Sequence, residues 1–385
     1  MKRYLVILGR KTELAYIELQ TVLRRTRPAK QSPSFIRLHH TVLVRTKQEF
    51  DPNLLQQVLG GTIKIGILGG RATTRDFMEK LTRVLRNEAI GKPKLTFGIS
   101  IVGNPHPNQR FLIPRELKDR LTSEGIVSRY VLPTKSDELT SAQVALGGVT
   151  ELYLIWTDAE VEIAKTCTVQ DFEGFAKRDY QRPYVNPRSG MLPPKIARQM
   201  VNLAFPRPPS KDSLILDPFC GTGTIAMEAM MLDINTINGD QNKEQVEGTK
   251  KNLTWLARET GKKANWKVVQ SDATKMAQAI DLKVDAIVTE PFLGPPNLIE
   301  KKVKNLIKGL NKLYLGAVKN WKKCLKKGGR LVLVIPEIHM GELVEAADLI
   351  IDRRENLGYT LVAGPLDYER EDAVVRRLIY VLELT

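Results

Sequence analysis

A short apolar strand that leads through a glycine loop into an apolar helix is the feature that most restricts how this chain can fold. The apolar run is Leu214–Asp217, Gly221 and Gly223 follow in a tight loop, and a helix is predicted from Thr224. Glycines let the backbone turn sharply and approach a ligand, and the free N–H groups at the start of the helix face that ligand. Several nucleotide-binding folds share this pattern, so the loop predicts a ligand site without naming the ligand.

Acidic residues follow three consecutive predicted strands. Asp217 ends the first strand, Asp240 ends the second, and Asp272 comes just after the third, Lys267–Val269. From Leu214 to the end of the chain strands and helices alternate, which is typical of a doubly wound α/β sheet with its ligand cleft at the carboxyl edge. The three acids are therefore expected around one cleft.

A cluster of carboxylates beside the glycine loop favours a ligand with a positive charge. Asp217 would repel a pyrophosphate, which disfavours NAD, whereas Asp240 stands where a carboxylate binds ribose hydroxyls. S-adenosylmethionine fits this arrangement, with its sulfonium and ammonium near Asp217, its ribose at Asp240 and its adenine amine at Asp272. A strand–helix turn that binds no ligand is the alternative reading of the same residues.

A proline-rich loop follows the fourth predicted strand of this sheet. Val284–Thr289 runs into Glu290, Pro291 and Phe292 at the edge where such sheets bind substrates. Methylation of an exocyclic amine on a base requires acceptors for its N–H groups, and the Glu290 carboxylate with a nearby carbonyl can supply them. Phe292 can stack on the base. A structural loop with a solvated Glu290 is the alternative.

The charge of the chain predicts a polyanionic partner. The 385 residues carry a net charge of +16, and two segments hold most of it: residues 1–50 have 11 basic and 3 acidic side chains, and residues 300–330 have 11 and 1. Clustered Lys and Arg release counterions from phosphates, so nucleic acid is the expected partner, and a solvated basic surface is the alternative. Three scattered cysteines and the lack of long apolar runs predict a cytoplasmic protein without disulfides, bound metal or membrane span.

Longer stretches of the chain resemble the THUMP-containing tRNA guanine-N2-methyltransferases, which methylate guanosine at tRNA position 10. Asp217–Thr224 is similar to the family's cofactor motif, and the segment from Val169 through Arg182-Pro183 to Ala197 is similar to its lead into the catalytic domain. The resemblance implies a ferredoxin-like domain over 1–70, a THUMP RNA-binding domain over 71–166, a linker over 167–192 and a methyltransferase domain over 193–385. The implied fold is α/β, with a mostly parallel Rossmann-like sheet whose last strand is antiparallel, preceded by two α+β modules.

This resemblance assigns roles to residues at both loops. Glu290, Pro291 and Phe292 are the expected catalytic residues. The expected S-adenosylmethionine-binding residues are Asp217, Phe219, Cys220, Gly221, Thr222, Gly223, Thr224, Asp240, Gln241, Asp272, Ala273 and Glu290. The implied activity is transfer of a methyl group to the exocyclic amine of a guanine in tRNA, with N2-methylguanosine at position 10 as the product.

One departure from the family pattern keeps two other functions open. The family usually has Asp-Pro-Pro-Tyr, whereas this chain has Glu290-Pro291-Phe292-Leu293. The longer carboxylate moves the acceptor by about one methylene, and a misplacement of about 1 Å can cost roughly 100-fold in rate. A weakened or inactive tRNA-binding protein that retains the cofactor pocket, and an amino-methyltransferase for another base, are the alternatives.

Overall fold

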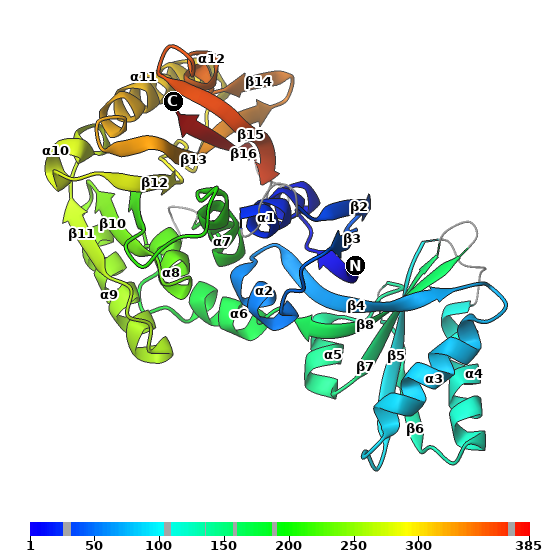
Figure 1. The fold of residues 1–385 in the computed structure, drawn as a ribbon. Coiled ribbons are helices and arrows are strands. Elements are labelled where there is room, and N and C mark those ends of the chain that lie inside the picture. The colour runs from blue at the N-terminus through cyan, green and yellow to red at the C-terminus, as the bar shows by residue number, and fades with distance from the viewer. Residues whose placement is uncertain (26–31, 104–108, 135, 157–159, 187–190, 369–373) are drawn as a thin grey trace. The chain divides into compact units, whose positions relative to one another are not determined.

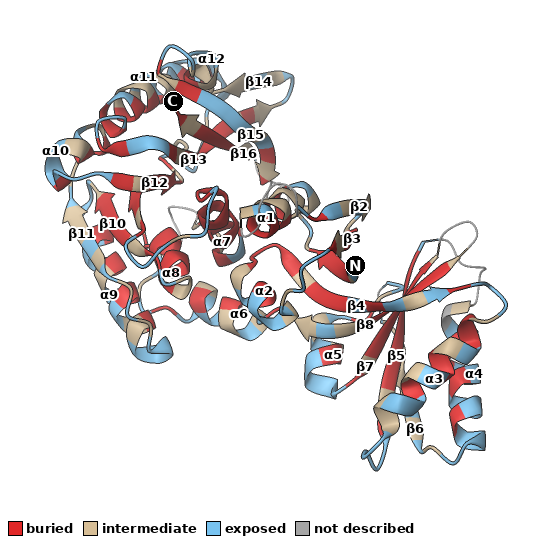
Figure 2. Ribbon diagram, in the orientation of Figure 1, coloured by how far each residue is buried: buried red, intermediate tan, exposed pale blue. Residues whose placement is uncertain are grey.

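Two separate eight-stranded sheets organise the chain (Figure 1). The computed structural model describes residues 1–25, 32–103, 109–134, 136–156, 160–186, 191–368 and 374–385. For Arg110 it describes the backbone alone. The N-terminal unit comprises Met1–Arg10, Ala29–Gln57 and Thr62–Phe172, and the C-terminal unit comprises Lys11–Pro28, Val58–Gly61 and Glu173–Thr385. Buried residues concentrate on the strands of both sheets (Figure 2).

The N-terminal unit is one mixed sheet with the strand order β2-β3-β1-β4-β8-β7-β5-β6. Its strands are β1 (Lys2–Leu8), β2 (Ser34–Leu38), β3 (Thr41–Thr46), β4 (Thr62–Ala72), β5 (Leu95–Val102), β6 (Ser128–Val131), β7 (Thr150–Trp156) and β8 (Val161–Val169). Its helices are α2 (Pro52–Val58), α3 (Phe77–Ala89), α4 (Gln109–Ser123) and α5 (Ser141–Gly147). Apolar side chains of α3 and α4, such as Leu81 and Leu117, pack together on the sheet with Phe97 of β5.

The division into ferredoxin-like and THUMP modules stays a prediction. Strand β4 runs across the predicted boundary at residue 70 and pairs with β1 on one side and β8 on the other, so the two predicted modules share one sheet. The predicted linker over 167–192 contains α6 (Phe172–Tyr180), whose Phe175 and Arg178 are buried. Positions 187–190 of that linker lie outside the described residues.

The C-terminal unit is a sheet with the order β11-β10-β9-β12-β13-β16-β15, to which β14 adds beside β13. Its strands are β9 (Leu214–Asp217), β10 (Asn235–Asp240), β11 (Trp266–Gln270), β12 (Val284–Thr289), β13 (Leu325–Met340), β14 (Leu343–Ala346), β15 (Tyr359–Tyr368) and β16 (Val375–Leu384). Strands β11, β10, β9, β12 and β13 pair in parallel, and β16 is antiparallel to both β13 and β15. The predicted Rossmann-like sheet with an antiparallel last strand is therefore confirmed.

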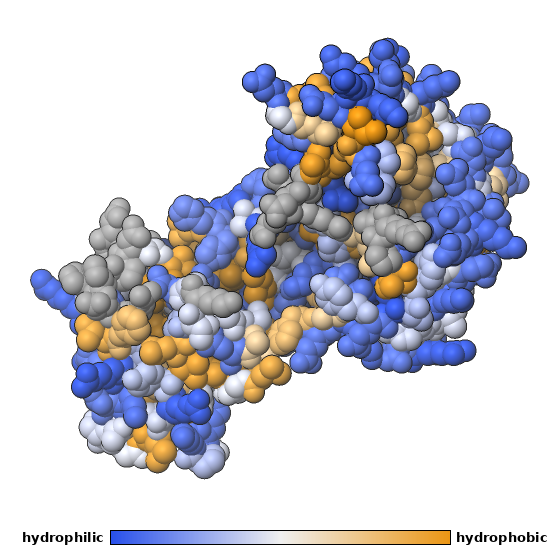
Figure 3. All heavy atoms as spheres, turned by 180° about the vertical axis from the view of Figure 1, so that it is seen from behind, coloured by the Kyte–Doolittle hydropathy of each residue, from blue (hydrophilic) through white to orange (hydrophobic). Residues whose placement is uncertain are grey.

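Helices cover both faces of this sheet because its buried strands are apolar on both sides. Along β12, Ile287 faces one core with α11, whereas Ala286 and Val288 face the other core with α7, as expected for a strand with a period of two. The helices are α6, α7 (Pro194–Leu203), α8 (Thr224–Met231), α9 (Lys243–Thr260), α10 (Met276–Ile280), α11 (Glu300–Trp321) and α12 (Leu349–Asp352), with a short 3₁₀ turn at Ala273–Lys275. Hydrophilic side chains cover much of this unit on the face shown in Figure 3.

A helix from the N-terminal part of the sequence completes this unit. Helix α1 (Thr12–Arg25) packs on α7, with Leu14 in the same apolar cluster as Val201. Glu18 on the buried side of α1 accepts hydrogen bonds from the N–H groups of Gly60 and Gly61, each at 2.8 Å. Burial raises the pKa of Glu18 to about 7, against these hydrogen bonds, which lower it. Among the described helices, none combines the length and apolarity needed to cross a membrane.

Candidate active site

The carboxyl ends of β9, β10 and β12 and the loop after β11 border one cavity of about 610 Å³ in the C-terminal unit. This is the edge at which parallel sheets bind ligands, beside the point where the strand order reverses between β9 and β12. Four carboxylates line it, those of Asp217, Asp240, Asp272 and Glu290. The cavity therefore suits a ligand that carries positive charge or hydrogen-bond donors.

Asp217 is the most deeply buried of these acids. Its side chain is 1% exposed, and its Oδ1 accepts hydrogen bonds from Thr289 Oγ1 at 2.8 Å and from the Phe219 N–H at 3.2 Å. Its pKa is raised to about 7, mainly by burial and in smaller part by the charges of Asp240 and Glu290, against the two hydrogen bonds, which lower it. A cation in the cavity would favour the ionised carboxylate.

The glycine loop holds Asp240 by its backbone. Gly221 adopts a φ of +51°, which favours glycine, and its N–H donates to Asp240 Oδ2 at 3.0 Å. The Asn242 N–H donates to the other oxygen, Oδ1, at 2.9 Å. Burial nevertheless raises the pKa of Asp240. These contacts fix the carboxylate at the end of β10, where a ribose is expected in this fold.

Gly223 has a packing role at the start of α8, and its role in cofactor binding stays a prediction. It is not among the described residues that line the cavity; it has a φ of +82°, and a Cβ there would approach Thr249 Cγ2 of α9 to 2.8 Å. Its absence of a side chain therefore allows α8 to begin against α9. Thr249 completes the junction by donating to the Gly221 carbonyl at 2.7 Å.

Asp272 combines a place at the cavity with a structural hydrogen bond. Its Oδ1 accepts from the Thr274 N–H and from Thr274 Oγ1, both at 2.8 Å, and so caps the short turn that begins at Ala273. These bonds lower its pKa, so the side chain is ionised at neutral pH. Both Asp272 and Ala273 line the cavity, as expected from the sequence.

The loop after β12 brings the predicted catalytic residues to the same cavity. Glu290, Pro291 and Phe292 all line it, and the Phe292 side chain is 53% exposed. The Tyr314 hydroxyl of α11 donates a hydrogen bond to the Phe292 carbonyl at 2.7 Å, which anchors the loop to α11. An exposed aromatic ring beside a nearly buried carboxylate can hold a planar base that has an amine on its edge.

Arg377 is the functional candidate that the sequence did not indicate. It lies on β16, and its Nε is 3.0 Å from Glu290 Oε1, with side chains that are 11% and 13% exposed respectively. Among the described residues that line the cavity, Arg377 is the single cation. No motif marks it, because its partner belongs to a distant loop and only the antiparallel strand brings the two together.

Buried arginines fasten the segment that precedes the sheet to the helix of the glycine loop. Glu228 of α8 accepts from Arg178 Nε at 2.6 Å and from Arg198 Nε at 2.8 Å, and all three side chains are buried. Arg182 donates to Thr224 Oγ1 at 2.7 Å, at the first residue of α8. The segment that resembles the family's lead into the catalytic domain thus holds the first turn of α8, and with it the glycine loop, in place.

The predicted site residues come together with one exception. Apart from Gly223, the cavity lining includes Asp217, Phe219, Cys220, Gly221, Thr222, Thr224, Asp240, Gln241, Asp272, Ala273, Glu290, Pro291 and Phe292. Their roles remain predictions. Within the described part of the chain, no group of three His, Cys, Asp or Glu side chains has the geometry of a metal site.

The C-terminal part of the chain matches a known family. Residues 181–353 match the UPF0020 family, described as an RMKL-like methyltransferase domain. This segment includes the glycine loop, the proline loop and α11, and ends before β15 and β16.

Curated relatives from archaea carry a more specific name. The tRNA (guanine(10)-N2)-dimethyltransferase of Methanothermobacter thermautotrophicus is 39% identical over 117 residues, which is 30% of this chain and 31% of the relative. The protein with the same name from Pyrococcus abyssi is 30% identical over 204 residues, which is 53% of this chain and 52% of the relative. The chain thus spans about a third to a half of the length of these two relatives.

Two solved structures share the fold over nearly the whole chain. TrmN from Thermus thermophilus aligns over the whole of both chains with a TM-score of 0.56 at 18% identity. A predicted N6-adenine-specific DNA methylase from Listeria monocytogenes aligns over 99% of this chain and 96% of its own with a TM-score of 0.52 at 14% identity. At these identities the two structures support the fold.

Proposed function

We propose that this protein is an S-adenosylmethionine-dependent tRNA methyltransferase that modifies the exocyclic amine of guanosine 10. The observation that carries the proposal is the single cavity that joins the carboxylates of Asp217 and Asp240 to Glu290 and Phe292. The names of the partly aligned relatives support the same substrate. A substrate of this kind also makes the cytoplasm the expected location.

The residues at the cavity suit the proposed cofactor. S-adenosylmethionine supplies an electrophilic methyl group on a positively charged sulfur. Asp217 lines the cavity with a buried carboxylate whose pKa is raised mainly by burial, and the positive charge of the cofactor would favour its ionised form. Asp240 would bind the ribose hydroxyls, and Asp272 would face the adenine with Ala273 against the ring.

The chain's own contribution to the reaction would be positioning and charge. Glu290 and the Pro291 carbonyl would accept hydrogen bonds from the guanine amine, which directs the nitrogen lone pair toward the methyl group, and Phe292 would stack on the base. When bound, the cofactor would supply the methyl group to the amine nitrogen and keep the electron pair of its broken C–S bond on sulfur, and the proton released by the amine would pass to solvent. An amine within an RNA helix has to be exposed by base flipping before it can reach this loop.

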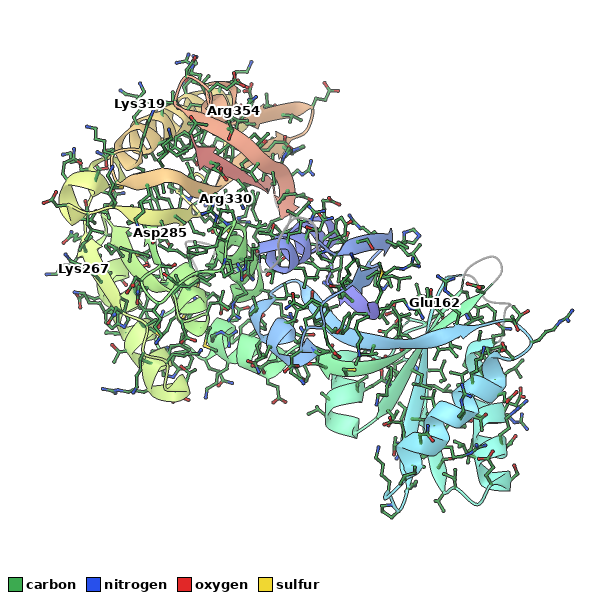
Figure 4. All side chains as sticks on the ribbon, viewed as in Figure 1. Glu162, Lys267, Asp285, Lys319, Arg330 and Arg354 are labelled. Carbon is green, nitrogen blue, oxygen red and sulfur yellow. The ribbon has the colours of Figure 1, made fainter. Side chains whose placement is uncertain are left out.

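A stripe of lysines on α11 supports an RNA partner. Lys301, Lys304, Lys308, Lys312 and Lys319 are all exposed and recur near one side of the helix, over about 27 Å at 1.5 Å per residue. Lys319 is marked on α11 in Figure 4. Among the described residues, no ion pair involves any of these five lysines, so their charge is available to phosphates. The predicted THUMP and ferredoxin-like modules would add shape recognition.

Methyl transfer to a defined tRNA tests the proposal. The protein is incubated with methyl-labelled S-adenosylmethionine and an unmodified tRNA transcript, and the nucleosides are identified by mass spectrometry. Label on the N2 nitrogen of guanosine 10 is expected, with none on a transcript that has adenosine at that position. Binding of cofactor and tRNA without transfer would instead favour a tRNA-binding protein, for which the Glu-Pro-Phe-Leu loop is the supporting feature. Label on another base or on DNA would also contradict the proposal.

A further inference from the structure

The antiparallel strand β16 places a guanidinium at the cavity, whose other described charged lining residues are all carboxylates. Because β16 runs against β13, its first residues lie at the edge where the parallel strands end, and Arg377 pairs in register with Pro336 there. Val375, two residues earlier and on the same side of the strand, lines the cavity as well. Arg377 thus reaches the proposed base-binding end of the cavity from a fixed strand.

Two contacts hold the Arg377 side chain. Its Nε lies 3.0 Å from Glu290 Oε1, and its guanidinium carbon lies 5.8 Å from the centroid of the Tyr368 ring on β15. A guanidinium has five N–H donors in a rigid fork, so one carboxylate oxygen does not exhaust it. The remaining donors can serve a ligand that occupies the cavity beside Glu290.

A carboxylate next to a guanidinium matches one edge of guanine. Guanine presents its 2-amino group and N1–H as donors, and the acceptor O6 follows on the same edge. Adenine has an amine in place of O6, so an N–H donor of the protein that faces this position would meet another donor. Arginine is the side chain that most often pairs with guanine O6 in nucleic-acid complexes.

We propose that Arg377 is a specificity-determining residue that selects guanine by donating a hydrogen bond to O6, while Glu290 accepts from the 2-amino group. This inference rests on the proposed function, because it assumes a purine substrate in the cavity. It also gives a reason for the longer acid at position 290: a glutamate reaches both Arg377 and the cavity.

Base replacement combined with substitution of Arg377 tests this role. Single-turnover methylation is measured on two tRNA transcripts, one with guanosine and one with 2,6-diaminopurine at position 10. The analogue keeps the 2-amino group and replaces O6 by an amine. The wild-type protein is expected to prefer guanosine by roughly 100-fold, and Arg377→Gln is expected to retain about a tenth of that preference or less. The analogue also lacks the N1 hydrogen of guanine, but this difference is the same for both proteins and cancels in the ratio of their preferences.

The neighbouring arginine provides a matched control. Arg376 lies on the same strand and pairs with Glu337 and Asp367 instead, and it does not line the cavity among the described residues. Arg376→Gln is expected to keep the wild-type preference for guanosine. Arg377→Lys retains a positive charge beside Glu290 but lacks the forked donors of a guanidinium. This variant is expected to have a lower preference for guanosine over 2,6-diaminopurine and to bind S-adenosylhomocysteine as wild type does.

Other outcomes overturn the inference in distinguishable ways. If Arg377→Gln and Arg377→Lys slow methylation of both transcripts by the same factor, Arg377 only positions Glu290 and the specificity role is wrong. Equal wild-type rates on the two transcripts would also mean that the specificity role is wrong. This comparison uses the wild-type protein alone, so it does not depend on whether a variant folds. If wild type methylates neither transcript, the proposed function itself fails and this inference fails with it.

Discussion

Thr289 Oγ1 donates a 2.8 Å hydrogen bond to Asp217 Oδ1, which joins the carboxyl ends of the neighbouring strands β12 and β9. Both side chains are buried, and Thr289 comes directly before Glu290 in the sequence. The residue that precedes the proposed substrate loop therefore stabilises the acid proposed to face the cofactor. The two halves of the site share one buried contact.

Removal of this hydroxyl should weaken cofactor binding. In Thr289→Val the Asp217 carboxylate loses a donor in a buried position, which costs about 1–3 kcal/mol in the ionised form and raises its pKa further. We expect S-adenosylhomocysteine to bind about 10-fold more weakly by calorimetry. Thr289→Ser, which keeps the hydroxyl, serves as the control, and equal affinity of the valine variant would exclude the contact from the site.

The raised pKa of Asp217 predicts opposite pH trends for binding and for stability. Its pKa is about 7 in the folded protein and near 3.8 when unfolded, so between these values the folded state binds more protons. The free energy of unfolding contributed by this group therefore falls as pH rises toward 7. Affinity for a cationic ligand rises over the same range, because the ionised form grows.

A comparison with Asp217→Asn isolates this effect, since Glu18 has a pKa near 7 as well and gives a stability trend of the same sign. The difference in unfolding free energy between wild type and the variant, from urea titrations at about pH 5 and pH 8, should shift in favour of wild type at the lower pH. A difference that does not change with pH would contradict a raised pKa at Asp217.

The buried contacts of Glu18 should make α1 part of the stability of the C-terminal unit. Glu18 accepts from Gly60, Gly61 and the Asn202 side chain, the last at 2.7 Å. Glu18→Ala would leave three buried donors without this acceptor, and we expect a loss of roughly 2–4 kcal/mol in urea unfolding. Glu13→Ala, at an exposed position on the same helix, should change stability by less than about 0.5 kcal/mol.

Reversal of charge on the α11 stripe should weaken tRNA binding and its salt dependence together. For Lys304→Glu, Lys308→Glu and Lys312→Glu combined, the slope of log affinity against log salt should become shallower by about 2. The control reverses three exposed lysines away from the stripe, Lys243, Lys263 and Lys267, the last of which is labelled in Figure 4. An equal loss of affinity in both triple variants would mean that overall charge, and not the α11 surface, binds the tRNA.

Local patterns in the sequence were sufficient to predict one part of the site. The acids at 217, 240 and 272 were predicted from their places after consecutive strands, because parallel strands align their carboxyl ends. The close approach of Gly223 to Thr249 of α9 could not be predicted from the glycine pattern, because the same pattern serves both ligand approach and helix packing.

Long-range pairing accounts for what the sequence did not predict. Arg377 meets Glu290 through the antiparallel position of β16, and Glu18 meets Asn202 across 184 residues of sequence. Neither pair has a spacing that a periodic pattern could reveal. The shared sheet of the first 169 residues, predicted as two modules, depends in the same way on β4 pairing with β8.

The most direct test of the account is the effect of Glu290→Gln on methyl transfer and on cofactor binding in the same preparation. The glutamine keeps the size of the side chain but replaces one acceptor oxygen by a donor, so single-turnover transfer to tRNA should fall by roughly 100-fold or more while affinity for S-adenosylhomocysteine stays within about 3-fold of wild type. Wild-type transfer rates in this variant would contradict the proposed role of the loop after β12.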